Sequence, residues 1–286
     1  MSGRNVSFIV IVLVIIGGVF LFMKKEAPKP IVIEQKPEFS TERVIGNSVD
    51  GREIRAYTFG NGVQKLLFVG GIHGGYEWNS VYLAYRVIDY VKENPEFVPD
   101  DVTLTIIPNL NPDGVFAGIG AEGRFDPNNT PSVEKTVPGR FNANGVDLNR
   151  NFDCKWQPTS TWRSQEVSAG SEPFSEPETK ALRDYILEIE PSLVAFWHSQ
   201  GGAVYGAICG NEIDSVSKDI IDIYGKASGY SSYETFDAYP VTGDAEGWLA
   251  SIGIPAITIE LATHETIEWE QNLAGTKAIL QYYAGK

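Results

Sequence analysis

Two of the three histidines in this 286-residue chain follow runs of apolar residues, and one glutamate does the same. His73 comes directly after KLLFVGGI, His198 ends SLVAFWH, and Glu260 ends AITIE. Two histidines and a carboxylate can bind zinc and leave its fourth position for water. A further carboxylate beside that water can act as a general base. These residues therefore indicate a metal-dependent hydrolase. The alternative is that the two histidines have only a structural role.

The segments that must position these residues alternate between strand and helix patterns. Continuous apolar runs predict buried strands, which cover 65–72, 102–111, 192–199 and 255–261. Helical spacing of apolar residues predicts helices over 79–94 and 175–191. The expected fold class is α/β, with a mixed, mainly parallel central sheet flanked by helices. The carboxyl ends of such strands form the ligand-binding edge, so His73, His198 and Glu260 are expected to meet there.

Two local signals refine these elements. Asp50-Gly51, within the segment 43–62, is a residue pair typical of a hairpin with a type I′ turn. Ser175 stands two residues before a proline at the start of the second helical segment, which predicts that it is the N-cap. The segment 43–62 therefore adds an antiparallel hairpin to the sheet.

The N-terminal segment has a different character from the rest. Residues 6–23 form eighteen residues without a charge, which is just long enough for a transmembrane helix. No small-residue cleavage site follows, so we expect an uncleaved anchor over 1–25, with a buried core helix as the alternative. Residues 26–40 are rich in proline and predict an extended linker before a catalytic domain at 41–286. This organisation predicts a single-pass membrane protein whose catalytic domain is extracytoplasmic.

Composition limits the class of partner. The formal net charge is −14 and the sequence pI is about 4.7. A nucleic-acid-binding protein needs a basic face for phosphate, so nucleic acid is excluded as a partner. A hydrophobic content of 43% fits a globular protein with a substantial core. We expect a monomeric catalytic domain that contacts the membrane only through its N-terminal helix.

Three segments point to a known family. They are NPDG at 111–114, GRFNANGVDLNRNF at 139–152 and PFSEPET at 173–179. With these segments in this order, the chain from about residue 42 to 283 resembles the M14 family of zinc carboxypeptidases. The resemblance implies one zinc ion per chain, held by His73, Glu77 and His198. It also implies that Glu260 is the general base that activates the attacking water and passes its proton to the leaving amine.

The resemblance assigns five further residues around that metal. Arg140 would polarise the scissile carbonyl and stabilise its oxyanion. Asn149 and Arg150 would hold a substrate carboxylate, Arg150 through a bidentate fork. Asp147 would accept a hydrogen bond from the first zinc histidine. Tyr239, 21 residues before Glu260, matches the mobile substrate-binding tyrosine of the family. The alternative is that the arginines are surface charges and that Asp147 and Asn149 are turn residues.

The sequence departs from the family pattern in two places. Three residues separate His73 from Glu77 where the family usually has two, and a bulge at the two intervening glycines would absorb the extra residue. The segment VTGDAEGWLA, at 241–250, lines the side-chain pocket in the family and here carries Asp244 and Glu246. Either carboxylate is expected to pair with a basic side chain or with the amine of diaminopimelate. The alternative is that both are solvated loop charges.

The two cysteines and the third histidine have separate interpretations. Cys154 directly follows DLNRNFD, and Cys209 follows the His198 strand by about ten residues, so both segments should approach the site. A disulfide between them is expected if the domain lies outside the cytoplasm, and two free buried thiols are the alternative. His264 is predicted to be a surface residue.

These observations support several functions of different classes. The first is a zinc metallocarboxypeptidase that removes a C-terminal residue from peptides. The second is a cell-wall peptidase or murein peptide amidase that cuts a γ-D-glutamyl bond next to diaminopimelate, with a muropeptide as substrate. The third is a membrane-tethered binding module on an inactive peptidase fold, which the intact set of ligands, base and arginines opposes. A small-molecule deacylase on a related fold is a fourth.

Overall fold

The computed structural model describes residues 39–210 and 212–286. The predicted transmembrane segment at 6–23 and most of the predicted linker lie outside these residues. Among the helices of the described part, none is long and apolar enough to cross a membrane.

One eight-stranded sheet forms the centre of the domain, with the strand order β1-β2-β4-β3-β7-β10-β8-β9. Its strands are β1 Ser40–Asn47, β2 Glu53–Phe59, β3 Gln64–Val69, β4 Val102–Ile107, β7 Leu193–Ser199, β8 Ala203–Gly206, β9 Ser231–Tyr233 and β10 Ala256–Leu261. A separate antiparallel pair consists of β5 Thr159–Trp162 and β6 Gln165–Ser168.

The direction of the strands confirms the predicted mixed, mainly parallel sheet. The central strands β4, β3, β7 and β10 are parallel to one another. The β8-β9 pair is also parallel, whereas β1-β2, β2-β4 and β10-β8 are antiparallel. Because β3, β7 and β10 run side by side in one direction, their carboxyl ends share one edge, as the apolar runs predict.

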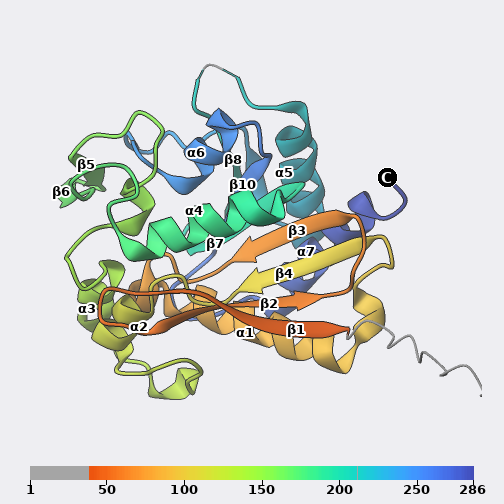
Figure 1. Cartoon of the computed structure of the whole chain (residues 1–286), viewed down its shortest axis with the longest axis horizontal. Helices are drawn as coiled ribbons and strands as arrows, with labels where there is room; N and C mark the ends of the chain where they lie inside the picture. The colour runs from red at the N-terminus through yellow and green to blue at the C-terminus, as the bar shows by residue number, and fades with distance from the viewer. Residues whose placement is uncertain (1–38, 211) are drawn as a thin grey trace, which may run out of the picture. The chain divides into compact units, whose positions relative to one another are not determined.

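Helices cover both faces of the sheet (Figure 1). The α-helices are α1 Trp78–Glu93, α2 Pro112–Ile119, α3 Val133–Thr136, α4 Pro177–Ile189, α5 Ser215–Ser228, α6 Ala245–Ser251 and α7 Trp269–Tyr283. Short 3-10 helices lie at Gly74–Glu77, Pro95–Phe97, Pro127–Asn129, Val137–Arg140 and Leu148–Arg150. One core cluster joins α1, α5 and α7 to the sheet, and a second joins α4 and α6 to its opposite face.

Alternation along β7 and β10 decides which residues face which core. Leu193, Ala195 and Trp197 belong to the core under α1, α5 and α7, whereas Val194 and Phe196 belong to the core under α4 and α6. Successive strand side chains point to opposite faces. His198 therefore lies on the α6 side of β7. By the same alternation, Thr258 and Glu260 lie on that side of β10, because Ile257 and Ile259 belong to the other core.

Two of the local predictions are wrong. The Asp50-Gly51 turn is not type I′, because that turn needs a positive φ at both residues and only Gly51 has one, at 84°. The N-cap of α4 is Glu176 rather than Ser175. Ser175 instead donates its hydroxyl proton to a carboxylate oxygen of Glu176 at 2.8 Å. In both places the predicted element exists, but the turn type or the N-cap residue differs from the prediction.

Candidate active site

A tight turn brings the first histidine and the nearby glutamate together. The segment Gly74–Glu77 forms one turn of 3-10 helix that leads into α1, rather than the expected bulge at the two glycines. Gly74 has φ +46°, and a Cβ atom there would lie 2.5 Å from the carbonyl oxygen of Gly139. Only glycine fits this position. The turn absorbs the extra residue between His73 and Glu77, and both side chains remain on one side of it.

The three predicted metal ligands converge in the structure. His73 Nδ1 lies 2.7 Å from Glu77 Oε1, and His198 Nδ1 lies 3.1 Å from Glu77 Oε2. The two Nδ1 atoms are 3.2 Å apart. All three residues are buried, with 2–5% of their surface exposed. The two imidazole nitrogens and the carboxylate face one point and could hold a metal ion, and two histidines with one glutamate are a known donor set for catalytic zinc.

Glu260 stands beside this centre. It pairs in register with His198 across the parallel strands β10 and β7. Burial raises the pKa of Glu260 to about 7, and the charges of Glu77 and Glu246 act in the same direction. One of its oxygens, Oε2, is buried without a hydrogen-bond partner among the described residues. A carboxylate with a pKa near neutral and an unused oxygen suits the task of a general base.

Asp147 and Arg140 form a buried ion pair next to His73. The Nε and terminal nitrogens of Arg140 contact Asp147 Oδ2 at 2.9 and 2.8 Å. Asp147 Oδ1 lies 3.3 Å from His73 Nε2. Burial opposes ionisation of Asp147, but the charges of Arg140 and Arg150 hold its pKa far below the usual range. Asp147 is therefore an anion placed between the metal ligand and the arginine, and Arg140 keeps one terminal nitrogen 3.6 Å from Glu77 Oε1.

Arg150 and Asn149 lie in the 3-10 turn Leu148–Arg150. Arg150 donates to the carbonyl oxygens of Asn149, at 2.6 Å, and Thr161, at 3.0 and 3.2 Å. Arginine has five N–H donors, so one N–H remains on each terminal nitrogen of Arg150 for a further acceptor. Asn149 accepts a hydrogen bond from the Ala245 amide at 2.8 Å, which ties this turn to the start of α6.

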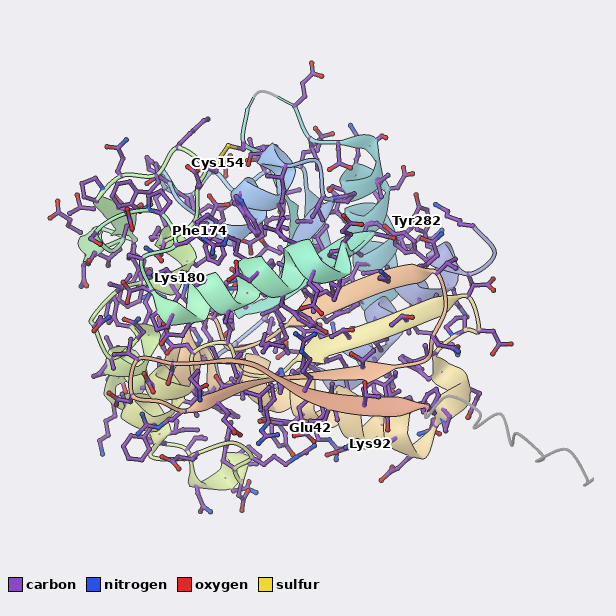
Figure 2. All side chains as sticks on the ribbon, in the orientation of Figure 1. Glu42, Lys92, Cys154, Phe174, Lys180 and Tyr282 are labelled. Carbon is purple, nitrogen blue, oxygen red and sulfur yellow. A yellow bond between two sulfur atoms is a disulfide. The ribbon has the colours of Figure 1, made fainter. Side chains whose placement is uncertain are left out.

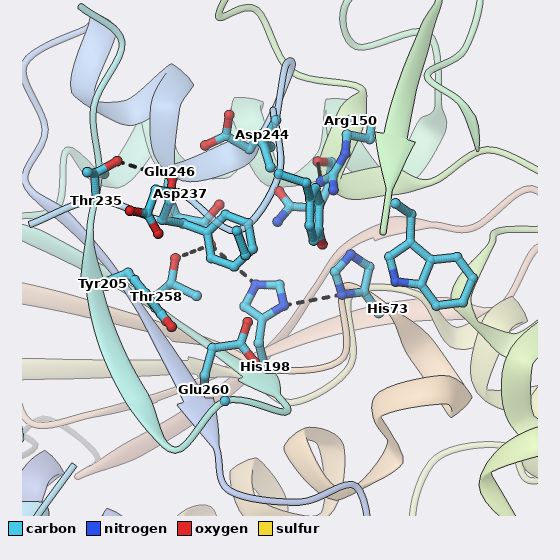
Figure 3. A pocket seen from close by; sticks show the side chains of 18 of the residues that line it. His73, Arg150, His198, Tyr205, Thr235, Asp237, Asp244, Glu246, Thr258 and Glu260 are labelled. Atoms are coloured by element: carbon cyan, nitrogen blue, oxygen red, sulfur yellow. Dashed lines mark hydrogen bonds and ion pairs between the residues drawn. The ribbon is translucent and has the colours of Figure 1, made fainter. Parts of the chain in front are cut away.

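Most of the predicted site residues line a single cavity of about 600 Å³. Of the eleven residues predicted to act in the site, the ten that line it are His73, Glu77, Arg140, Asn149, Arg150, His198, Tyr239, Asp244, Glu246 and Glu260. The eleventh, Asp147, lies behind His73 and is fully buried. Figure 3 shows His198 between His73 and Glu246, with Glu260 close to His198.

The two acidic residues of the segment 241–250 are not solvated loop charges. Asp244 is the N-cap of α6 and accepts a hydrogen bond from the Gly247 amide at 2.8 Å. Burial and the nearby charge of Glu246 raise the pKa of Asp244 to about 6. Glu246 is 4% exposed, and its carboxylate contacts His198 rather than solvent. Both residues therefore belong to the wall of the cavity, although they are already engaged within the protein.

Ser199 and His264 form further contacts near Glu77 that the sequence patterns did not predict. The Ser199 amide donates to Glu77 Oε2 at 3.2 Å, and the Ser199 hydroxyl donates to Asn79 Oδ1 at 2.9 Å. His264 Nδ1 lies 2.8 Å from the same hydroxyl. The prediction that His264 is a surface residue is wrong, because only 3% of it is exposed. It packs on Tyr76 with ring centroids 4.6 Å apart, a contact that depends on the return of the chain after β10.

A disulfide resolves the open question about the cysteines. Cys154 and Cys209 are bonded, with their Cα atoms 5.9 Å apart and 55 positions apart in the sequence (Figure 2). Cys154 lines the cavity, and Ile208 next to Cys209 does too. The bond therefore links the segment after Arg150 to the segment after β8, on two walls of the cavity.

The comparisons with known proteins agree with this geometry. The profile of the family described as Peptidase_M14, zinc carboxypeptidase, matches residues 32–281. The gamma-D-glutamyl-L-diamino acid endopeptidase 1 of Lysinibacillus sphaericus is 25% identical over 246 residues, which cover 77% of this chain and 60% of the relative. Carboxypeptidase B of Astacus astacus is 30% identical over 168 residues, covering 56% of this chain and 54% of the relative. The chain thus spans less than two thirds of both relatives.

A solved structure extends the agreement to the fold. The murein-tripeptide amidase MpaA of Escherichia coli O157 superposes with a TM-score of 0.58 at 21% identity, over 84% of this chain and 91% of that one. At this identity the likeness concerns the fold. The family match spans most of the chain, and the cluster of His73, Glu77 and His198 supplies the ligands for the zinc cofactor. The chain therefore belongs to the M14 family of zinc carboxypeptidases.

Proposed function

We propose that this protein hydrolyses a peptide bond next to a free carboxylate, most simply as a carboxypeptidase. The observation that carries the proposal is the common cavity, in which the metal ligands, Glu260 and the free N–H groups of Arg150 meet. A protein that only binds its ligand would not need the metal ligands, Glu260 and Arg150 to lie together in one cavity. The complete set, buried and mutually oriented, supports a hydrolase rather than an inactive copy.

The roles follow from the chemistry of each side chain. When bound, zinc polarises the scissile carbonyl and lowers the pKa of a water molecule. Glu260 takes a proton from the attacking water and passes it to the leaving amine. Arg140 donates to the carbonyl oxygen as negative charge develops there. Arg150 and Asn149 hold the substrate carboxylate, and this places the scissile bond beside Glu260.

A second candidate is cleavage of a γ-D-glutamyl bond next to diaminopimelate in a muropeptide. Asp244 shares the cavity with Arg150, so one wall offers an anion and the turn beside it offers a cation. An amino acid whose side chain carries an amine as well as a carboxylate would meet both. The endopeptidase from Lysinibacillus sphaericus acts, by its name, on a γ-D-glutamyl-diamino acid bond, which supports this candidate.

One assay separates the two candidates. The full chain, purified in detergent and loaded with zinc, is incubated with peptides ending in lysine or leucine and with muropeptides that contain the γ-D-glutamyl-diaminopimelate bond. A carboxypeptidase releases the last residue from the simple peptides. A cell-wall enzyme leaves those peptides intact and cuts only the muropeptides. If neither class is cut, and chelator changes nothing, the proposal is wrong.

A further inference from the structure

Glu246 makes a contact that the substrate-pocket interpretation does not account for. Its Oε1 lies 3.2 Å from Nε2 of His198 and 3.0 Å from the hydroxyl oxygen of Thr258. Glu246 is in the first turn of α6, Thr258 is on β10, and His198 is on β7. Figure 3 shows Glu246 and Thr258 on one side of the His198 ring and His73 on the other. The carboxylate thus faces the edge of the ring away from the metal ligands.

The chemistry of the ring fixes the direction of these hydrogen bonds. His198 Nδ1 faces Glu77 and His73, so Nδ1 is the nitrogen that offers its lone pair to the metal. A neutral imidazole then carries its proton on the other nitrogen. Nε2–H therefore donates to Glu246 Oε1, and the hydroxyl of Thr258 donates to the same oxygen. A carboxylate that accepts from a metal-bound histidine orients the ring and makes it a stronger ligand.

The other metal histidine, His73, also has a carboxylate on its outer side. Asp147 lies on the outer side of His73, 3.3 Å from its Nε2. The family resemblance predicts Asp147, whereas the only role predicted for Glu246 was contact with the substrate. Its neighbour Asp244 has no contact with His198 and instead caps α6. The two acidic residues of the segment 241–250 therefore have different roles, and only Glu246 lies against a metal ligand.

We propose that Glu246, held by Thr258, is a positioning residue that orients His198 and strengthens its bond to the metal. The inference rests on the zinc centre of the proposed function, but it is independent of the substrate. It assigns to Glu246 a carboxylate–histidine contact of the kind that Asp147 is predicted to make with His73. It also removes Glu246 from the groups that select the side chain of the substrate.

The test measures metal affinity without any substrate. The zinc dissociation constant of the full chain in detergent is determined by competition with a chromogenic chelator. Glu246→Ala is expected to weaken zinc binding about 10- to 100-fold, as is typical when such a partner is lost. Glu246→Gln keeps an oxygen that accepts from Nε2–H, so its loss is expected to be smaller. Thr258→Val removes one hydrogen bond to Glu246 and is expected to shift affinity in the same direction.

The matched control is Glu270→Gln, in the first turn of α7, where the side chain is exposed and outside the cavity. Its zinc affinity is expected to stay within twofold of the parent chain. The visible spectrum of the cobalt-substituted protein gives a second reading, because a turned His198 ring changes the ligand field in Glu246→Ala. Thermal denaturation of the metal-free variants checks that they fold, and Glu246→Gln keeps the size of the side chain.

The outcomes separate a positioning role from a specificity role. Weaker zinc binding with an unchanged order of substrate preference supports the proposal. Zinc affinity within twofold of the parent in both Glu246 variants overturns it. A changed preference between lysine and leucine substrates at unchanged zinc affinity would return Glu246 to the substrate pocket. Because no substrate enters the affinity measurement, failure of the proposed function in the peptide assay leaves this result intact.

Discussion

At the scale of single residues, burial and shared contacts set the chemistry of the site. Glu260 combines a raised pKa of about 7 with an unused oxygen, because it is buried at the end of a strand beside other carboxylates. Asp147, equally buried, keeps its charge because Arg140 lies against it. Two buried carboxylates of the same site thus differ in proton affinity, because their neighbours carry different charges.

Replacement of the base gives the first prediction. Glu260→Gln should leave zinc affinity unchanged and lower kcat by a factor of about 10² to 10⁴, the range of a general acid–base group. The amide keeps the shape but cannot accept the proton of the attacking water. Zinc content by elemental analysis and turnover on the best substrate are measured on the same preparation. A variant with near-parental kcat would exclude this role for Glu260.

The second prediction concerns Arg150 as the residue that binds the substrate carboxylate. Amidation of the carboxylate beside the scissile bond should weaken cleavage about 10- to 100-fold, since a charge-assisted hydrogen-bond pair contributes about 1.5–3 kcal/mol. Arg150→Ala should cut free and amidated substrates at similar, low rates, because the fork is gone. Arg124→Ala, an exposed arginine paired with Asp89, is the control. Equal rates on both substrates with the parent chain would contradict the assignment.

At the scale of elements, the sequence predicts where the strands lie, but it does not predict which side chains of different elements contact one another. The apolar runs that end at His73, His198 and Glu260 are buried strands because they lie under helices on both faces, and continuous apolar runs are the pattern of such strands. The contact between Glu246 and His198 joins α6 to β7 across 48 positions, and only the packing of α6 decides it. The same is true of His264, which a turn after β10 brings back onto Tyr76.

Gly243 shows why that packing is specific. It has φ +71°, and a Cβ atom there would lie 2.2 Å from the carbonyl oxygen of Arg150. The segment before α6 therefore approaches the 3-10 turn Leu148–Arg150 more closely than any side chain would permit. The amide contact between Ala245 and Asn149 depends on this approach.

The third prediction concerns the covalent link between the cavity walls. Cys154→Ser with Cys209→Ser should lower the free energy of unfolding by about 4 kcal/mol, the loop-entropy value for a link across this many residues. For a domain of this size that corresponds to a fall in Tm of about 10 °C. Reductant should shift the Tm of the parent chain but not of the double variant. A Tm within about 1 °C of the parent in the double variant would show that the link adds no stability.

At the scale of the whole molecule, two properties concern location: the compartment of the catalytic domain and the membrane anchor predicted at the N-terminus. The described residues contain the zinc centre and the cavity, and the charge-free run at 6–23 lies outside them. Disulfides persist mainly in oxidising compartments, so the link between Cys154 and Cys209 supports an extracytoplasmic domain. The proposal is a membrane-anchored hydrolase that works outside the cytoplasm.

The fourth prediction tests that arrangement. The full chain should sediment with membranes, and a chain lacking residues 1–25 should remain in the supernatant, because eighteen uncharged residues suffice to span a bilayer. Protease added to intact cells should digest the domain. Protection of the domain until the cells are lysed would place it inside, and sedimentation of the shortened chain would show that another surface holds it to the membrane.

The position of Asp147 between His73 and Arg140 has a consequence for how substitutions in this site combine. A substitution at Asp147 removes a contact of the zinc ligand His73 and a contact of Arg140 together, so its effect on rate contains both losses. Residues that share a partner show non-additive effects, with interaction energies of about 0.5–3 kcal/mol. The cost of a change at His73 or Arg140 therefore depends on whether Asp147 is present. The three positions are thus energetically coupled, so a single substitution at any of them does not measure the contribution of that residue alone.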